Sequence, residues 1–308
     1  MSVGYNPLML LLLGCTTAIP DDTAEPAPCL SEVDGENAGF ADYATAGATM
    51  GTHCAGTDHQ EIEGVERLVF MGDSVTEGTP PTETWAYYRS LVTEGVRARF
   101  GDDLPVDECS RWGARTDDLL QDGDPAQIAE CFPEVEERRT LVVLTVGGND
   151  VVAFSDELDA GATDEAVLAS ADAALGLLHD ALIHLRDPSF FPGGVDVVLG
   201  NVFEFTDATG DLVACPLAET FGFTGTYPQM LEGYAYINQA YAGMAVELDI
   251  DLVFMHENFC GHGFHNDDPD SPCYRGADNE RWFDNTCIHP NPAGHAELAR
   301  MVLAVVDE

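Results

Sequence analysis

The 308-residue sequence carries 12 basic and 55 acidic side chains, which gives a formal net charge of −43, and every basic residue is an arginine. This charge excludes a protein that binds along nucleic-acid phosphates. The absence of lysine excludes a P-loop nucleotide site, a pyridoxal-phosphate Schiff base and a Ser-x-x-Lys acyl enzyme.

A short apolar run at positions 8–14 ends at Cys15. The run is too short to cross a bilayer but long enough for the core of a signal peptide. Its last residues, Leu-Leu-Gly-Cys, resemble a bacterial lipobox, in which the cysteine is lipidated. We therefore expect residues 1–15 to be a lipoprotein signal, with a plain secretory signal or a misassigned start as alternatives. The protein would then be an outer-membrane or cell-surface lipoprotein, otherwise periplasmic or secreted, with its lipid as the one membrane anchor.

Residues 16–64 are predicted to form an acidic, proline-containing tether followed by an irregular segment, and the compact domain is predicted over 65–308. Of nine cysteines, eight remain after Cys15, and an even number in an exported chain indicates up to four disulfides. Buried free thiols are the alternative. Proximity in the sequence favours the pairs Cys29–Cys54, Cys109–Cys131, Cys215–Cys260 and Cys273–Cys287.

From residue 67 onward, short β-rich apolar runs alternate with longer stretches of helical periodicity. This alternation is typical of parallel strands joined by crossover helices, so we expect a three-layer α/β/α sandwich with a central, mainly parallel five-stranded sheet. The predicted strands are 67–71, 104–108, 140–146, 195–202 and 251–255, and the predicted helices are 82–100, 125–137, 164–186, 228–248 and 292–306.

Three helix starts have typical residues. Asp164 is placed as an N-cap, and Pro228 and Pro292 suit the first turn of their helices. In the helix 164–186, apolar side chains recur at helical spacing and predict one buried face. These side chains are Val167, Leu168, Ala171, Ala174, Leu175, Leu178, Leu182 and Leu185.

Unusual residues follow the strands, where sheets of this kind place their sites. Gly72-Asp73-Ser74 follows the first strand, Arg111-Trp112-Gly113 the second, Gly147-Gly148-Asn149-Asp150 the third, and Cys287-Ile288-His289-Pro290-Asn291 precedes the last helix. In this order, the four blocks resemble those of the SGNH hydrolases, also called the GDSL esterase and lipase superfamily, over about residues 67–306. The resemblance implies a flavodoxin-like fold and a serine ester hydrolase.

The residue types suit that chemistry. Ser74 lies in a turn where its hydroxyl can face substrate, and His289 can take the hydroxyl proton and return it to the leaving group. The resemblance implies an oxyanion hole made by the backbone N–H groups of Ser74 and Gly113 and by the side-chain amide of Asn149. We expect glycine at position 113 because a side chain there would crowd the acyl group.

The third catalytic member departs from the pattern. The family usually carries Asp three residues before the histidine, and that position here is Thr286. Two replacements stay open. The main-chain carbonyl of Thr286 could hold the histidine N–H, or the side chain of Asp284 could reach it if the loop bulges; the carbonyl is favoured because Asp284 needs an unusual loop.

Other polar residues have structural explanations. Asp73 and Asp150 are expected to hold their loops by accepting backbone N–H bonds, and His295 is expected to be a structural residue of the last helix. No metal or organic cofactor is expected. The large negative charge should raise the pKa of His289 above about 6.5 and make activity best at mildly alkaline pH.

The sequence thus predicts an esterase or lipase-like enzyme that acts on a small-molecule, lipid or glycan ester and does not bind nucleic acid. Two other hypotheses remain: an acyltransferase or deacetylase that acts on a glycan or lipid, and a catalytically inactive surface-binding lipoprotein.

Overall fold

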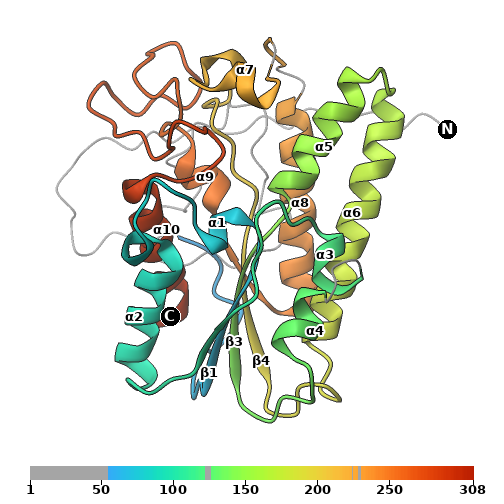
Figure 1. Ribbon diagram of the computed structural model, residues 1–308, viewed down its shortest axis with the longest axis vertical. Helices are drawn as coiled ribbons and strands as arrows, with labels where there is room; N and C mark the ends of the chain where they lie inside the picture. Colours follow the sequence, from blue (N-terminus) through green and yellow to red (C-terminus); the bar gives the residue numbers. More distant parts are fainter. Residues whose placement is uncertain (1–54, 122–125, 224, 228–229) are drawn as a thin grey trace, which may run out of the picture.

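The computed structural model describes residues 55–121, 126–223, 225–227 and 230–308. Its centre is a five-stranded sheet in the order β2-β1-β3-β4-β5, and every pair of neighbouring strands is parallel. The predicted three-layer sandwich is confirmed (Figure 1). The strands are β1 (Arg67–Gly72), β2 (Val106–Glu108), β3 (Thr140–Thr145), β4 (Val195–Gly200) and β5 (Asp251–Val253).

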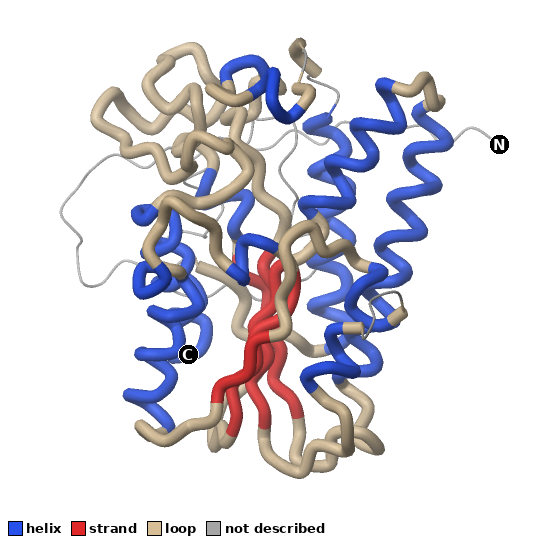
Figure 2. The backbone as a smooth tube through the Cα atoms, viewed as in Figure 1, coloured by secondary structure: helices blue, strands red, loops and turns tan. Residues whose placement is uncertain are grey.

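Helices cover both faces of the sheet, as Figures 1 and 2 show. Helices α2 (Tyr88–Phe100) and α10 (Pro292–Asp307) pack side by side on one face. The opposite face carries α3 (Asp117–Leu120), α4 (Gln127–Cys131), α5 (Gly148–Asp159), α6 (Asp164–Leu185) and α8 (Met230–Leu248). Because four strands are buried along their whole length, their apolar runs are continuous rather than alternating.

Five short elements complete the described chain. They lie near the carboxyl ends of the strands or in the connections that follow them. They are α1 (Ser74–Glu77), η2 (Thr84–Ala86), η3 (Leu212–Ala214), α7 (Ala218–Phe221) and α9 (Met255–Phe259).

Several predicted helix boundaries are wrong. The helix expected over 82–100 is split, because extended backbone at Tyr87 separates η2 from α2. The helix expected over 125–137 ends at Cys131, two residues before Pro133, which disfavours helix in the residue that precedes it. Helix α5 is a missed element, and it begins inside the Gly-Gly-Asn-Asp block.

The outcome differs among the three predicted helix starts. The N-cap of α6 is Thr163 rather than Asp164, since the Thr163 hydroxyl accepts the N–H of Ala166. Pro292 does lie in the first turn of α10, after Asn291 as N-cap. Pro228 lies outside the described residues.

The buried face of α6 is largely as predicted. Leu168 is the clear exception, since its side chain is 47% exposed. Helix α6 has the length and apolar composition of a membrane-spanning helix, but its buried side belongs to the core of the domain. The buried residues are Ala171, Leu175, Leu178, Ala181, Leu182 and Leu185.

The described part of the predicted N-terminal segment, residues 55–64, packs along the edge strand β5. Gly56 forms an antiparallel bridge with Val253. The carboxylate of Asp251 accepts bonds from the hydroxyl of Thr57 (3.0 Å), the N–H of His59 (2.8 Å) and the amide of Gln60 (2.9 Å). These contacts cover an edge that would otherwise offer unpaired backbone groups.

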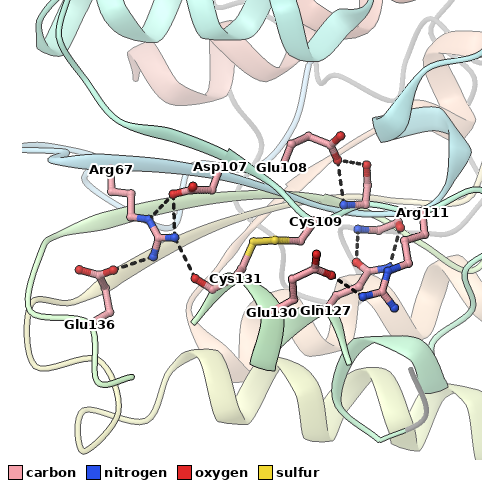
Figure 3. The surroundings of a disulfide bond; sticks show 11 residues. Arg67, Asp107, Glu108, Cys109, Arg111, Gln127, Glu130, Cys131 and Glu136 are labelled. Atoms are coloured by element: carbon pink, nitrogen blue, oxygen red, sulfur yellow. Dashed lines mark hydrogen bonds and ion pairs between the residues drawn. A yellow bond between two sulfur atoms is a disulfide. The ribbon is translucent and has the colours of Figure 1, made fainter. Parts of the chain in front are cut away.

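Three disulfides are present in the described residues. Cys109–Cys131, which joins the chain after β2 to α4, confirms one prediction (Figure 3). The other two, Cys215–Cys287 and Cys260–Cys273, show that the predicted pairs Cys215–Cys260 and Cys273–Cys287 are wrong. Distance along the chain misled, because folding brings position 287 back beside position 215. The predicted pair Cys29–Cys54 lies outside the described residues.

Candidate active site

The candidate site lies at the carboxyl ends of β1 and β3. In the sheet, β2 lies on one side of β1 and β3 lies on the other, so the direction in which strands are added reverses at β1. This is the switch point at which doubly wound sheets bind their ligands. Ser74 begins α1 directly after β1, and Asn149 lies in the first turn of α5 after β3.

The backbone before Ser74 is fixed from several directions. Gly72 has φ +112°, and a Cβ atom on it would overlap the carbonyl oxygen of Thr145. The buried side-chain amide of Gln127 accepts the N–H of Gly72 at 2.7 Å and donates to its carbonyl at 2.8 Å. Figure 3 shows Gln127 on α4 beside the Cys109–Cys131 disulfide. Strand register and α4 together hold the turn that presents Ser74.

Asp73 and Asp150 act on the loops as predicted. Asp73 accepts the N–H of Val75 and the hydroxyl of Thr145, both at 3.0 Å, and burial raises its pKa to about 7. Asp150 accepts the N–H (3.2 Å) and the hydroxyl (3.1 Å) of Thr116, and burial raises its pKa to about 6. The hydrogen bonds confirm the loop-holding interpretation of both carboxyl groups.

Folding brings Ser74 and His289 together from positions 215 residues apart. The Oγ atom of Ser74 lies 2.8 Å from Nε2 of His289, which is hydrogen-bond distance. Ser74 comes from the turn after β1, and His289 comes from the loop before α10. The predicted nucleophile and the predicted base are therefore in contact.

The other ring nitrogen of His289 contacts Thr286, through the hydroxyl group. Thr286 Oγ1 lies 2.8 Å from Nδ1 of His289. The same hydroxyl donates to Oδ1 of Asp284, and the backbone N–H of Thr286 donates to that oxygen at 2.7 Å. The ring is thus held by neither the Thr286 carbonyl nor Asp284 directly, the two alternatives that the sequence left open.

Burial determines the direction of the His289 shift. Removal from water lowers the pKa of the imidazole below its ordinary value, and the negative charge of Asp284 acts in the opposite direction. The expectation that the net charge raises this pKa is wrong, because most surface carboxylates are far away and screened by solvent, whereas desolvation acts on the ring itself.

Asn149 and Gly113, two of the groups proposed for the oxyanion hole, have different surroundings. Asn149 lines the cavity, and its Nδ2 donates to the carbonyl of Ala114 at 2.9 Å. Gly113 is exposed, and a Cβ atom added to it would meet no atom within 4 Å. The predicted crowding concerns a bound acyl group and stays a prediction. The positive φ of +77° at position 113 by itself favours glycine.

His295 occupies a separate place inside α10. It is fully buried, and its Nδ1 accepts the N–H of Tyr88 at 3.2 Å. Burial lowers its pKa to about 4. This hydrogen bond to α2 confirms the structural role predicted for His295.

A cavity of about 90 Å³ opens beside Ser74 and His289. Four of its residues, Val151, Ser155, Met230 and Tyr234, also line a groove of about 350 Å³ between α5, α6 and α8. The sequence held no signal for these four residues, because they lie on α5, which was not predicted, and on α8, where apolar side chains are expected to pack in the core. The further apolar side chains that line the cavity are Val75, Val146, Val152, Val202, Phe203, Phe205, Leu212, Phe223, Met255 and Ile288.

A family model described as GDSL-like lipase/acylhydrolase matches residues 70–297. Among curated proteins, none matches the sequence.

Solved structures are similar to this chain at low identity. A phospholipase A1 from Streptomyces albidoflavus is 20% identical, with 79% of this chain and 98% of that chain covered and a TM-score of 0.51. An acetylxylan esterase from Geobacillus stearothermophilus is 17% identical, with 81% and 97% covered and a TM-score of 0.47. An extracellular lipase from Streptomyces rimosus is 20% identical, with 79% and 99% covered and a TM-score of 0.49.

Proposed function

Because the chain belongs to the GDSL-like lipase/acylhydrolase family, we propose that it hydrolyses carboxylic esters through an acyl-enzyme on Ser74. The observation that carries the proposal is the 2.8 Å contact between Ser74 Oγ and His289 Nε2 beside an apolar cavity. A serine hydroxyl is a poor nucleophile until a neighbouring base takes its proton.

In the first half of the reaction, Ser74 Oγ attacks the ester carbonyl carbon while its proton moves to His289 Nε2. The carbonyl oxygen becomes an anion, for which the N–H of Ser74, the N–H of Gly113 and the amide of Asn149 are the proposed donors. When the tetrahedral intermediate collapses, His289 returns the proton to the leaving alkoxide. The acyl group then remains on Ser74.

In the second half, a water molecule is the nucleophile in place of the Ser74 hydroxyl. His289 removes a proton from the water as it attacks the acyl carbonyl, and the same donors stabilise the second oxyanion. Collapse restores the Ser74 hydroxyl and releases the acid. Every step uses groups of this chain and water.

The cavity favours an uncharged, apolar acyl group. Its wall is mainly aliphatic and aromatic. An anionic acyl chain would lose its hydration there, which is unfavourable. Met230 lies where the cavity adjoins the groove beside α8, and its flexible side chain is placed to limit acyl length.

Export from the cytoplasm, with a lipid on Cys15, is part of the same proposal. The described disulfides support an oxidising compartment, because such bonds rarely persist in the cytosol. The lipobox-like residues before Cys15 support the anchor. Mass spectrometry of the protein from a bacterial host tests it, since an unmodified, uncleaved N-terminus would contradict the proposal.

The experiment that tests the activity uses p-nitrophenyl esters of graded chain length. Wild-type protein should hydrolyse them, and Ser74→Ala should lose at least about 10³-fold in kcat. Ser90→Ala is the matched control, because Ser90 lies on α2 and its hydroxyl donates to the carbonyl of Thr84, away from the Ser74–His289 pair. Its rate should equal that of the wild type.

A fluorophosphonate probe separates the remaining alternatives. Covalent labelling at Ser74 supports an enzyme, and folded wild-type protein that is neither labelled nor active would overturn the proposal in favour of a binding protein. Product analysis with an added alcohol acceptor distinguishes hydrolysis from acyl transfer.

A further inference from the structure

The hydrogen-bond chain behind His289 contains one group more than a Ser-His-Asp triad. Thr286 Oγ1 lies between the ring and the carboxylate, 2.8 Å from Nδ1 of His289 and in contact with Oδ1 of Asp284. Thr286 occupies the position at which the resemblance leads one to expect an aspartate. The carboxylate is moved two residues back along the chain, and a hydroxyl bridges the gap.

The direction of this chain follows from the proton count. If Nε2 accepts the proton of Ser74, the neutral ring carries its own proton on Nδ1. The Thr286 hydroxyl must then accept from Nδ1–H, and its single proton is left to donate to Oδ1 of Asp284. Each group in the series then has only one arrangement of its hydrogen that bonds to both neighbours. This arrangement fixes the ring in the tautomer that carries its proton on Nδ1.

The carboxylate of Asp284 is buried beside the His289 turn, where its charge is little screened by solvent. It is 7% exposed, and its Oδ1 also accepts the backbone N–H of Thr286. Within the part of the chain that the structure describes, its Oδ2 is buried and has no hydrogen-bond partner. A buried carboxylate with an unsatisfied oxygen interacts strongly with a positive charge that develops nearby.

The turn itself is closed by backbone contacts. The N–H of Asp284 donates to the carbonyl of His289 at 2.9 Å, and the N–H of Cys287 donates to the carbonyl of Asp284 at 3.1 Å. Phe283 and Pro290 form an isolated bridge on either side. The relay therefore lies within one compact turn that includes His289.

We propose that Thr286 is a positioning residue that couples Asp284 to His289, so that hydroxyl and carboxylate together replace the single aspartate of the usual triad. The hydroxyl orients the ring, and the carboxylate orients the hydroxyl and stabilises the imidazolium that forms when Ser74 loses its proton. This inference rests on the proposed function, because it concerns the same base.

Three variants test the relay. Thr286→Val keeps the side-chain shape but removes the hydroxyl, and we expect kcat to fall about 10²-fold with little change in KM. Thr286→Ser restores the hydroxyl and should recover most of the lost kcat. Asp284→Asn keeps an oxygen acceptor but removes the charge, and kcat should fall about tenfold.

The pH profile distinguishes the relay from a purely structural role. The Asp284 charge raises the pKa of His289, so its removal should lower that pKa further. The acid limb of kcat/KM for Asp284→Asn should therefore move to lower pH than in the wild type. A packing defect would reduce the rate without moving the limb.

The matched control is Asn285→Ala in the same turn. Asn285 is exposed, and its side chain makes only a 3.4 Å contact with Arg281 in the described residues, so wild-type kinetics are expected. Equal losses in Thr286→Val and Thr286→Ser, or an unmoved acid limb in Asp284→Asn, would overturn the relay. Failure of the proposed function looks different, because wild-type protein itself would then be inactive and unlabelled.

Discussion

The two sides of the site are held in different ways. Ser74 and Asn149 follow β1 and β3, which pair over six residues from Arg67 and Thr140 onward. His289 lies in an irregular stretch of residues 260–291, between α9 and α10. The nucleophile side is positioned by the backbone ladder of the sheet, whereas the base side depends on the hydrogen bonds of one turn, on side-chain contacts and on a disulfide.

The two sides of the site are held by different contacts with the rest of the chain. Ser74 needs strand register, a tight approach at Gly72 and the amide of Gln127. The His289 turn is fastened by Cys215–Cys287, and Asn291 donates to the carbonyl of Arg281 at 2.7 Å. A local change in the sheet near Ser74 therefore disturbs the pairing of whole strands. The position of His289 depends on a few contacts that single substitutions can remove.

The largest expected effect comes from the strand side. Gly72→Ala places a methyl group against the Thr145 carbonyl at a positive φ, which should destabilise the fold by about 3 kcal/mol or more. Urea unfolding measures the loss. Gly101→Ala is the control for the φ term alone, because it has φ +132° and no atom within 4 Å of an added Cβ. Equal losses in both variants would refute the clash.

The next effect concerns the amide beside the nucleophile. Asn149→Ala should lower kcat about 10²–10³-fold, the loss typical of one oxyanion donor. Part of this loss reflects the bond from Asn149 Nδ2 to the carbonyl of Ala114. A kcat within a few-fold of the wild type would show that Asn149 only holds the loop.

Paired disulfide variants compare the two sides directly. Loss of either bond should lower the free energy of unfolding by about 2–4 kcal/mol. Cys215→Ser with Cys287→Ser should also lower kcat about 10–100-fold, because His289 lies two residues from the lost anchor. Cys109→Ser with Cys131→Ser should leave kcat of the folded fraction nearly unchanged, since strand register and Gln127 still hold Gly72.

Equal kcat losses in the two double variants, measured well below their unfolding transitions, would break the comparison. They would mean that both sides depend equally on covalent anchoring. Reduction of the wild type with a thiol provides the same comparison without mutation, provided that the reduced bond is identified by alkylation and mass spectrometry.

A smaller effect is expected at the helical wall of the cavity. Met230→Trp should close the connection to the groove and lower kcat/KM for long-chain esters about tenfold relative to acetate esters. Acetate hydrolysis should stay near the wild-type rate, because Met230 is not part of the Ser74–His289 pair. A uniform loss over all chain lengths would argue against this wall as the acyl site.

The smallest effect is the position of the wild-type acid limb. Burial lowers the pKa of His289 below 6.5, so the protonated, inactive form appears only at lower pH. The acid limb of kcat/KM should have its midpoint below 6.5. A midpoint clearly above that value would show that the protein's overall charge outweighs burial at the ring.

Much of the fold was readable from the sequence because buried parallel strands are continuous apolar runs. All five strands start within two residues of their predicted positions. Helix α5 was missed because it starts at Gly148, directly after Gly147 as N-cap, and burial of Val151 against the core stabilises a helix that propensity alone does not favour. Tertiary contacts, not local preference, decide such elements.

The sequence by itself determined the order of the five strands along the chain, the turn that carries Ser74 and the histidine expected to serve it, because these depend on local patterns of apolar and turn residues. Only the tertiary structure decided which cysteines pair, which atom holds Nδ1 of His289 and in which direction its pKa moves. Each of these depends on distances and burial between residues far apart in the chain, and spacing along a sequence does not encode them.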